Sequence, residues 1–426
     1  MSNMKWKTVK IGDVADICLG KMLDQEKNQG NYMPYLANIN VRWGEFDLLN
    51  LRRMRFESDE LEKFSLKYGD IIMCEGGEPG RCAIWKQHNS NILFQKALHR
   101  IRTYECLDSN YLYYVLLLMG KHNSFDPFLT GSTIKHLPSI KLAIIDIPLP
   151  PLPIQRKIAA VLTALDDKIA LNKRINDKLE AMVKRLYDYW FVQFDFPDEN
   201  GRPYKSSGGK MVWNEMLKRE IPAGWEVKNV KNVIKPIQRG ISYSSEDIGS
   251  SEGISLINLG CYSKQGDYRT GELKTYSGNY SFEDLVFPFD MLIACTDMTQ
   301  NCDIIGRPIF AHKENAFYLY TMDLAKLSPN DGTRMYLYYT LRTNFYHRYI
   351  KPFASGTNVK HLNVAGIENY SICIPDDNTK YRFEDMITTI KEKQMDSINE
   401  ASRLTALRDR LLPLLMNGQV VVEGEE

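Results

Sequence analysis

YLYY at residues 111–114 and FLTGSTIKHL at residues 128–137 decide the fold, because both strings recur later in the chain. They return as YLYY at 336–339 and FASGTNVKHL at 353–362, at a constant offset of 225 residues. Five of the ten positions in the longer string are identical, and three more differ by near-isosteric replacements. The chain therefore carries one module twice. Two equivalent units favour a twofold arrangement and a twofold target.

The two copies span residues 111–190 and 336–415, and short apolar runs that alternate with turn signals precede each of them. In the first half Gly69 and Asp70 lead into the run at 71–73, and similar runs follow turns in the second half. This alternation is typical of strands joined by turns. Both halves are therefore predicted to be α+β domains.

The hydrophobic period changes from two to seven after Pro153 and after Pro375, where each domain ends in an apolar strand. Apolar residues then recur at alternating steps of four and three, which is the seam of a coiled coil. Arg408 interrupts the second seam, and the neighbouring Leu407 is expected to take its place. The predicted seam residues are Ile158, Leu162, Leu165, Ile169, Leu179, Val183 and Leu186 in the first helix and Ile387, Ile390, Leu404 and Leu411 in the second.

Polar residues occupy the middle of both seams, with Asn172 and Asn176 in one helix and Gln394 and Ser397 in the other. Two interpretations stay open. These positions are either solvated parts of imperfect helices or polar layers that meet and fix the register. Antiparallel pairing about the helix centres would place Asn176 opposite Ser397 and Asn172 opposite Ala401.

The sequence predicts five segments in the order domain, helix, linker, domain, helix. The linker is inferred from the polar string NGRPYKSSGGK and the low apolar content around it. The fold class expected is α+β, with the two helices paired as an antiparallel coiled coil and a pseudo-twofold relation between the halves. The boundaries are 1–153 for the first domain, 154–195 for the central helical spacer, 196–220 for the linker, 221–376 for the second domain, and 377–426 for the C-terminal helix and acidic tail.

Composition excludes several classes of protein. At 426 residues the chain is too long for one core. We expect no membrane association and a cytoplasmic location, because no apolar run approaches the ~18 residues of a membrane span. Eight cysteines lack a Cys-x-x-Cys pair and a histidine at ligand spacing, so neither a zinc site nor a disulfide framework is expected. A net charge of +1 does not exclude nucleic acid, because a local basic face is what matters.

Three features carry a resemblance to a known family: PLPPLPIQRKIAAVLTALDDKI at 148–169, WFVQFDFPDENGRPYKSSGGKMVWNEMLKREIPAGW at 190–225, and the two GSTIKHL-like strings. In these the chain resembles the specificity subunit of Type I restriction-modification systems. The family pattern has Glu before Gln155, whereas this chain has Ile154. PDDNTKYRFEDM replaces the motif in the second copy, which leaves the helix start near Lys380 open.

The resemblance implies two target recognition domains, each followed by a long helix, in a subunit that is not itself an enzyme. It implies double-stranded DNA, two methyltransferase subunits and restriction or translocase subunits as partners. S-adenosylmethionine, ATP and Mg²⁺ would belong to those partners, and this chain would hold no cofactor or metal. The residues agree, because the Gly-Lys pairs at 20, 120 and 209 lack the context of a phosphate-binding loop.

The repeated strings supply the first candidate DNA contacts. Short hydroxyl and amide side chains beside a cation suit the anchoring of phosphates. A polar β-turn on the surface is the alternative, since a shared fold would also preserve a turn. The candidates are Ser132, Thr133, Lys135 and His136 in the first copy and Thr357, Asn358, Lys360 and His361 in the second.

The loops that end in Gly80-Arg81 and Gly306-Arg307 supply the second set. Arginine can bridge O6 and N7 of a guanine, although a solvated arginine at a strand start is an equal alternative. The loops differ strongly, as EGGEPGR and TDMTQNCDIIGR, which two different half-sites would demand. The candidates are Arg81 and Arg307, with Thr296, Asp297, Thr299, Gln300 and Asn301 as base-reading residues.

Residues after the first strand hairpin of each domain supply the third set. Asparagine pairs bidentately with adenine, the base that such a system would methylate. The candidates are Asn38, Asn40 and Arg42 in one copy and Asn258, Tyr262 and Lys264 in the other, with Lys21 and Arg239 as phosphate contacts near each domain start.

Two other function classes stay open. A DNA-modifying or DNA-cleaving enzyme would need a metal or cofactor site, and no carboxylate cluster here has recognisable spacing. A tandem scaffold that binds only protein would rely on its coiled-coil spacer. Methylation by the purified chain with S-adenosylmethionine alone would establish the first, and a salt-sensitive, sequence-dependent gel shift would exclude the second.

Overall fold

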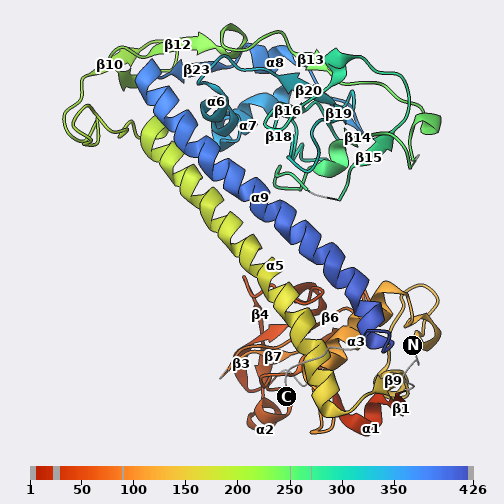
Figure 1. Cartoon of the computed structure of the whole chain (residues 1–426). Helices are drawn as coiled ribbons and strands as arrows, with labels where there is room; N and C mark the ends of the chain where they lie inside the picture. The colour runs from red at the N-terminus through yellow and green to blue at the C-terminus, as the bar shows by residue number, and fades with distance from the viewer. Residues whose placement is uncertain (1–5, 23–28, 89–90, 250, 270, 421–426) are drawn as a thin grey trace. The chain divides into compact units, whose positions relative to one another are not determined.

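The computed structural model describes residues 6–22, 29–88, 91–249, 251–269 and 271–420 (Figure 1). The chain divides into two compact units. Unit 1 comprises Met1–Ile169 with Arg403–Glu426, and unit 2 comprises Ala170–Ser402. The acidic residues at the C-terminal end lie outside the described ranges. The domain boundaries inferred from the sequence stay predictions.

Unit 1 contains three β-sheets, with strand orders β1-β9, β2-β8-β5-β6 and β4-β3-β7. In the last sheet β3 pairs antiparallel with β4 and parallel with β7. The elements are β1 (Lys7–Lys10), α1 (Ile11–Val14), β2 (Ala15–Leu19), β3 (Asn31–Leu36), β4 (Arg52–Phe56), α2 (Ser58–Lys63), β5 (Ile71–Cys74), β6 (Cys82–Ile84), β7 (Leu93–Phe94), β8 (Leu98–Thr103), α3 (Ser109–Lys121), α4 (Ser139–Ala143), β9 (Asp146–Leu149) and the start of α5 (Leu152–Tyr187).

Unit 2 repeats this topology with sheets β12-β23, β13-β20-β16-β18 and β15-β14-β19. The central strand of the last sheet, β14, again pairs antiparallel with one neighbour and parallel with the other. The elements are β10 (Met211–Asn214), β11 (Arg219–Pro222), β12 (Glu226–Asn229), β13 (Gln238–Arg239), β14 (Ile254–Ile257), β15 (Lys274–Tyr276), β16 (Met291–Ala294), β17 (Thr296–Asp297), β18 (Pro308–Phe310), β19 (Leu319–Tyr320), β20 (Leu324–Leu327), α6 (Arg334–Thr340), α7 (Asn344–Ile350), β21 (Ala354–Ser355), β22 (Lys360–Leu362), α8 (Ala365–Glu368), β23 (Ser371–Ile374) and α9 (Asp377–Met416).

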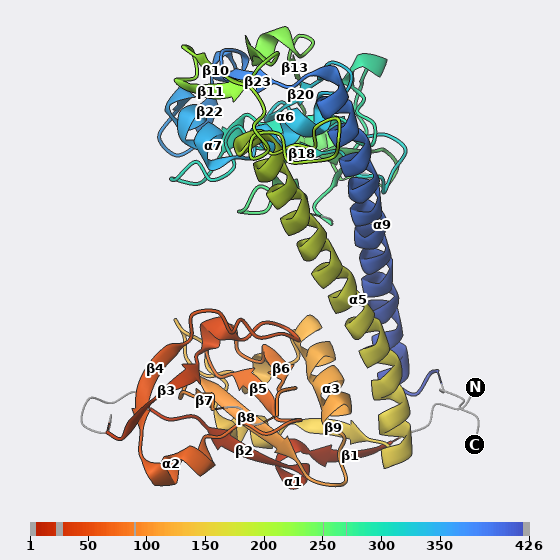
Figure 2. The ribbon, with the colours of Figure 1, turned by 90° about the vertical axis from the view of Figure 1, so that its left-hand side faces the viewer.

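The matching sheet orders confirm the prediction of two α+β modules. The YLYY strings lie on α3 and α6 and are buried in both units. In unit 1 the helix α3 lies between the strands and α5 (Figure 2), and its apolar residues share one core with residues such as Leu162 of α5 and Leu412 of α9. Unit 2 has an equivalent core that includes Phe383 and Ile387 of α9. Each domain is thus held to the helices by an apolar contact.

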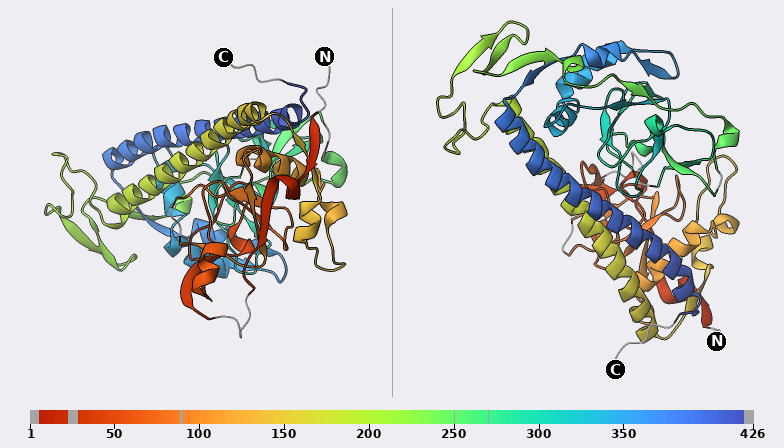
Figure 3. Two further views of the ribbon diagram at one scale, coloured as in Figure 1. Left: turned by 90° about the horizontal axis from the view of Figure 1, so that it is seen from below. Right: turned by 45° about the horizontal axis from the view of Figure 1, so that its top comes forward.

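Within each unit α5 and α9 run antiparallel and lie side by side (Figure 3). In unit 2 Asn172 donates to Glu400 at 2.8 Å, and Gln394 donates to the main-chain oxygen of Asn176 at 3.0 Å. The partners therefore fall within one turn of those expected from pairing about the helix centres. Every predicted seam residue is buried or half-buried. The polar residues mid-helix do meet, as the second interpretation proposed.

One part of the seam prediction is wrong. Leu407 does not replace Arg408, because Leu407 is exposed while Arg408 points inward and pairs with Asp166 of α5. The helix α9 begins at Asp377, where the side chain of Asp376 accepts a hydrogen bond from the main-chain nitrogen of Thr379 at 2.9 Å.

The proline-rich motif at the start of α5 contains Gln155, which is fully buried. Its amide donates to the main-chain oxygens of Cys106 and Pro150 and accepts from the main-chain nitrogen of Asp108. This one side chain therefore ties the helix start to the preceding strand and to α3. The helix begins at Leu152, two residues before the predicted position.

The segment predicted as a linker is ordered. It carries the antiparallel hairpin β10–β11. Phe196 stacks against Tyr204 at 4.7 Å and against Trp225 at 4.9 Å, and Ser206 donates to Asp195. The polar composition concealed these aromatic anchors, which lie in the core of unit 2.

The described ranges also bear on the expectations for cysteines, metals and membrane spans. All eight cysteines are free thiols. Those ranges hold no group of histidine, cysteine and acidic side chains arranged to bind a metal. A separate search of the same residues finds no helix whose length and apolar character would suit a membrane span.

Candidate functional site

Three predicted segments that are far apart in the sequence meet in unit 1. The glycine-rich loop after β5 contacts the repeated string, because Gly76 forms a β-bridge with His136 and Leu137 donates to the main-chain oxygen of Glu75 at 2.8 Å. Arg81, at the end of that loop, donates to the main-chain oxygen of Asn38 at 3.0 Å. The structure therefore brings the first, second and third candidate sets to one place.

In unit 2 the loop and the repeated string meet in the same way, with more regular strand pairing. The segment after β16 forms β17, which pairs with β22 of the repeated string in the register Thr296 to His361. The strand β22 also pairs with β21, so the string FASGTNVKHL is a hairpin. Leu362 donates to Cys295 at 2.8 Å, as Leu137 does to Glu75 in unit 1.

The hairpin of each string depends on its glycine. Gly131 and Gly356 have φ of 96° and 121°, in the left-handed region that favours glycine. A Cβ at Gly131 would lie 2.3 Å from the oxygen of Ile134, and one at Gly356 would lie 2.0 Å from the oxygen of Val359. The turn therefore requires glycine at this position in both copies. A preserved turn is the structural explanation for the repeat that the recurrence of the string alone could not exclude.

Many candidate side chains project from these hairpins and loops into solvent. A hydroxyl, amide or cation that is exposed can reach a phosphate or a base edge without rearrangement of the domain. The exposed candidates are Arg42, Ser132, Thr133, Lys135, His136, Arg239, Lys264, Gln300, Asn301, Thr357, Asn358 and His361. The half-buried ones are Asn38, Arg81, Asn258, Thr299, Arg307 and Lys360.

Some half-buried candidates already have partners inside the domain. Arg307 donates to the main-chain oxygen of Asp303 at 2.9 Å and lies 3.2 Å from Nδ1 of His347. Burial and the nearby charge of Arg342 lower the pKa of the Arg307 guanidinium. Asn258 caps the following turn through the main-chain nitrogen of Gly260. The side chains of Arg307 and Asn258 therefore also stabilise the conformation of the loops in which they lie.

Five candidates are buried, and the side chains of four of them bond within their own domain. Asp297 accepts hydrogen bonds from three main-chain nitrogens of its own loop, including that of Ile304 at 2.7 Å. The hydroxyl of Tyr262 donates to Leu292 inside the core. The polar atoms of these side chains are engaged inside the domain in this structure, and their role as DNA contacts stays a prediction. The five are Lys21, Asn40, Tyr262, Thr296 and Asp297.

The other buried groups follow the same logic. Lys21 pairs with Glu60 and lies over the ring of Phe56 at 5.2 Å, so its charge is satisfied within unit 1. Asn40 accepts from the nitrogen of Ala37 and donates to the oxygen of Asp47. The periodic pattern of the sequence could not distinguish these buried polar side chains from exposed ones, because a turn can direct a polar side chain either into the domain or into solvent.

The sequence analysis missed a basic strand at the edge of the sheet β4-β3-β7. Arg52, Arg53 and Arg55 of β4 are all exposed, and Arg55 lies over the ring of Tyr32 at 4.7 Å. The equivalent strand of unit 2, β15, carries Lys274 over the ring of Tyr243. The run RRMRF was the available signal. Cations on an exposed strand are suited to contacts with phosphates.

Comparison with known proteins gives a consistent result. Residues 3–181 match the family described as Type I restriction modification DNA specificity domain. The chain is 24% identical to the Type I restriction enzyme MjaIX specificity subunit of Methanocaldococcus jannaschii, over 98% of this chain and 94% of that protein. It is 22% identical to the HindI specificity subunit of Haemophilus influenzae, over 97% of this chain and 99% of that protein.

A solved structure shares the fold. The S subunit of the Type I restriction-modification system from M. genitalium superposes with a TM-score of 0.61 at 15% identity. The match covers 100% of this chain and 98% of the other. The two chains therefore share a fold over nearly their whole lengths.

Proposed function

This chain belongs to the family of Type I restriction-modification specificity subunits, and on that premise we propose that it is the non-catalytic subunit that recognises DNA for such a complex. The observation that carries the proposal is that a polar loop meets the repeated hairpin in each unit, and that in unit 1 the segment of Asn38 joins them. The two units share their topology and differ in the loops at that place. A common scaffold with different loops suits two half-sites of different sequence.

Within each site the hairpin and the loop take different roles. The hydroxyls and lysines of the hairpins bind phosphates, which position the domain without reading sequence. The exposed parts of the loops, such as Gln300 and Asn301, and the half-buried Arg81 are placed to reach base edges in a groove. The basic strand β4 adds phosphate contacts in unit 1.

The helices supply the surface for protein partners. Exposed apolar side chains follow one another along α5 within unit 2, namely Leu171, Ile175 and Met182, and Tyr189 follows in the helical turn Asp188–Val192 directly after it. A shallow groove beside them is lined by Met182, Leu186, Tyr189, Met386 and Ile390. An exposed apolar face of this kind marks a protein interface. We assign it to the methyltransferase subunits, with restriction subunits joining that core complex.

Cofactors of the reaction then belong to the partners, S-adenosylmethionine to the methyltransferase and ATP with Mg²⁺ to the restriction subunits. The purified chain with S-adenosylmethionine alone should not methylate DNA. Methylation under those conditions would establish the enzyme alternative.

Exchange of one domain tests the proposal. Residues 1–150 are replaced by the same domain of a relative, and methylated adenines are mapped in cells that also express the methyltransferase partner. One half-site should change while the other stays intact. A simultaneous change in both halves would refute modular recognition. The protein-only scaffold predicts no sequence-dependent, salt-sensitive binding of DNA by the assembled complex, which a gel shift measures.

A further inference from the structure

A buried tyrosine of α3 is bonded to an ion pair between the two helices in unit 1. The hydroxyl of Tyr114 donates to Oδ2 of Asp166 on α5 at 2.8 Å. The other carboxylate oxygen, Oδ1, accepts from Nη1 of Arg408 on α9 at 2.7 Å. Tyr114 is only 2% exposed, and its hydroxyl has one other polar neighbour, the hydroxyl of Thr163 on α5 at 3.5 Å. Three helices thus meet at one carboxylate.

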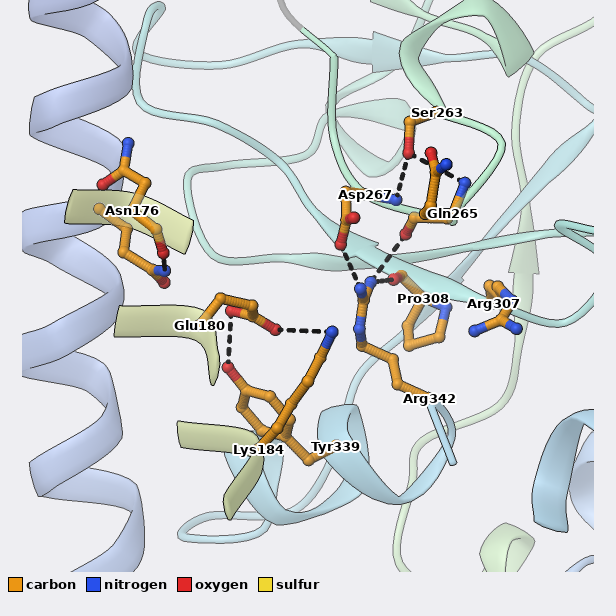
Figure 4. Close-up of polar contacts among 12 residues, drawn as sticks. Asn176, Glu180, Lys184, Ser263, Gln265, Asp267, Arg307, Pro308, Tyr339 and Arg342 are labelled. Carbon is orange, nitrogen blue, oxygen red and sulfur yellow. Dashed lines mark hydrogen bonds and ion pairs between the residues drawn. The ribbon is translucent and has the colours of Figure 1, made fainter. Parts of the chain in front are cut away.

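Unit 2 holds a network of the same form, of which Figure 4 shows Tyr339 and Glu180, with Lys184 beside the other oxygen of the same carboxylate at 3.9 Å. The hydroxyl of Tyr339 on α6 donates to Oε2 of Glu180 on α5 at 3.2 Å. The same oxygen accepts from Nζ of Lys391 on α9 at 2.6 Å. Tyr339 is also 2% exposed, and Lys391 is buried. Again a tyrosine of the recognition domain is bonded to an ion pair that joins α5 and α9.

The two networks are related by the repeat but have opposite polarity. Tyr339 and Lys391 stand at the positions equivalent to Tyr114 and Asp166, at the same offset of 225 residues. The helix that follows the domain therefore contributes the acid in unit 1 and the base in unit 2. In each unit the other helix supplies the opposite charge, Arg408 in one and Glu180 in the other. A tyrosine bonded to an ion pair between α5 and α9 therefore recurs although the charges are exchanged, and in both units the carboxylate belongs to α5.

These networks add directional hydrogen bonds, which the apolar contact around them does not provide. Burial of apolar surface is non-directional, so it would tolerate a domain that slides or tilts on the helices. A hydrogen bond weakens steeply when its distance or angle changes, and a buried hydroxyl or charge left without a partner is costly. The networks therefore favour one placement of each domain on its helices over neighbouring ones.

We propose that Tyr114 with Asp166 and Arg408, and Tyr339 with Glu180 and Lys391, are positioning residues that fix each recognition domain on its helix pair and thereby set the spacer length that the subunit accepts. The inference rests on the proposed function, because only a bipartite reader has a spacer. One base pair corresponds to ~3.4 Å along the duplex. A shift of a domain by part of a helical turn, which is ~5.4 Å, would therefore admit a neighbouring spacer length.

The test maps methylated adenines in cells that express the full chain with its methyltransferase partner. Tyr114→Phe and Tyr339→Phe remove one hydroxyl each and leave both ion pairs. We expect methylation at sites whose spacer differs by about one base pair to rise by about tenfold over wild type, the factor expected for one lost hydrogen bond to a charged group. The bases of both half-sites should stay unchanged.

Tyr111→Phe is the matched control. Tyr111 lies on the same helix and is fully buried, but its hydroxyl donates to Pro148 within the domain at 3.1 Å. This variant should keep the wild-type spacer. A rescue variant, Asp166→Lys with Arg408→Glu, copies the polarity of unit 2 and should restore the single spacer that Asp166→Lys alone relaxes.

The outcomes separate the inference from the proposed function. Wild-type methylation without two half-sites would refute the proposed function. Wild-type methylation at one spacer, with the same single spacer in both tyrosine variants, would overturn only the inference. Altered half-site bases, complete loss of methylation in Tyr114→Phe, or a charge-exchanged pair that stays relaxed would overturn it as well.

Discussion

Arg408 of α9 donates from Nη1 to Oδ1 of Asp166 on α5 at 2.7 Å, at the position where the apolar stripe of the second helix is interrupted. The same guanidinium donates to Asp409 at 2.8 Å. Burial lowers the pKa of Arg408, but its bonds and attraction to Asp166 and Asp409 outweigh that effect and raise it. The residue that interrupts the apolar stripe thus forms an ion pair between the two helices.

Replacement of Arg408 by leucine should therefore destabilise unit 1, although it completes the stripe. The change leaves the half-buried Asp166 without its cationic partner, and the expected loss in the free energy of unfolding is ~1 to 2 kcal/mol, at the low end for a buried pair because solvent screens it in part. Denaturant unfolding of the full chain measures it. Leu407→Ala, at an exposed position, should change the stability by less than ~0.5 kcal/mol. Equal losses of stability in the two variants would contradict this role of the ion pair.

The pair of Glu180 and Lys391 predicts a pH dependence. Burial tends to raise the pKa of Glu180, but the charges of Lys391 and Arg342 outweigh it and lower the pKa from 4.5 to about 2. The folded state therefore holds the proton more weakly than the unfolded state. The stabilisation is fully present above pH 4.5 and is lost as the pH falls toward 2.

Glu180→Gln should accordingly lower the free energy of unfolding at pH 7 and flatten its decline between pH 4.5 and pH 2. Chemical unfolding of the full chain across that range is the measurement. Glu392→Gln changes an exposed carboxylate of α9 and serves as the control. A variant whose stability falls as steeply as wild type over this range would contradict the assignment to Glu180.

Periodicity accounts for how well the fold could be predicted. The seam from Ile158 to Leu186 has a strict period that only a helix with one buried face satisfies, and all of its residues are buried or half-buried. The repeat of YLYY likewise located α3 and α6. The order of the segment between the domains was missed because Phe196, at its start, is anchored by a ring contact with Trp225, which lies beyond the far end of that segment.

The candidate site was predictable only in part. Residue type and recurrence located the hairpins around Lys135 and Lys360, but they could not give the burial of Asp297 or Tyr262. Burial of a loop residue depends on how the main chain turns, and no period governs that. The networks at Tyr114 and Tyr339 were also invisible, because each combines residues from three helices.

The glycines of the hairpins predict a local effect on DNA binding. Gly356→Ala places a Cβ against the oxygen of Val359, so the hairpin must distort and its exposed side chains move. We expect DNA affinity of the assembled complex to fall by about tenfold or more, for a local conformational penalty of ~1 to 3 kcal/mol. Gly201→Ala is the control, because its φ is 75° and nothing lies within 4 Å of the new Cβ. Similar losses in both variants would show that the hairpin is not the cause.

The lysines of the repeated strings should act as phosphate contacts. Lys135→Ala and Lys360→Ala should each weaken DNA binding for all sequences and reduce the slope of log affinity against log salt by about one. Titration of the assembled complex at several salt concentrations measures both quantities. A changed methylation motif at unchanged affinity would instead assign these residues to base reading.

The two long helices are predicted to act as a ruler. The helix α5 has 36 residues and α9 has 40, so α5 alone is ~54 Å long at ~1.5 Å per residue. Two similar modules that face one duplex through its dyad run in opposite directions along it, and antiparallel helices suit that geometry. The target should therefore consist of two short specific sites that flank base pairs which the protein does not read.

Insertion of seven residues after Ala170 and seven after Met395 tests the ruler directly. Seven residues preserve both seams and lengthen the pair by ~10.5 Å, which corresponds to about 3 base pairs of extra spacer. The helical rotation of those base pairs must be absorbed by the twist of the helices or by deformation of the DNA, so the observed increase can be smaller. Methylated sites in cells that carry the insertion should keep both half-sites and show a wider gap. Normal activity at the original gap would refute the ruler, since a longer spacer that leaves the target unchanged does not measure it.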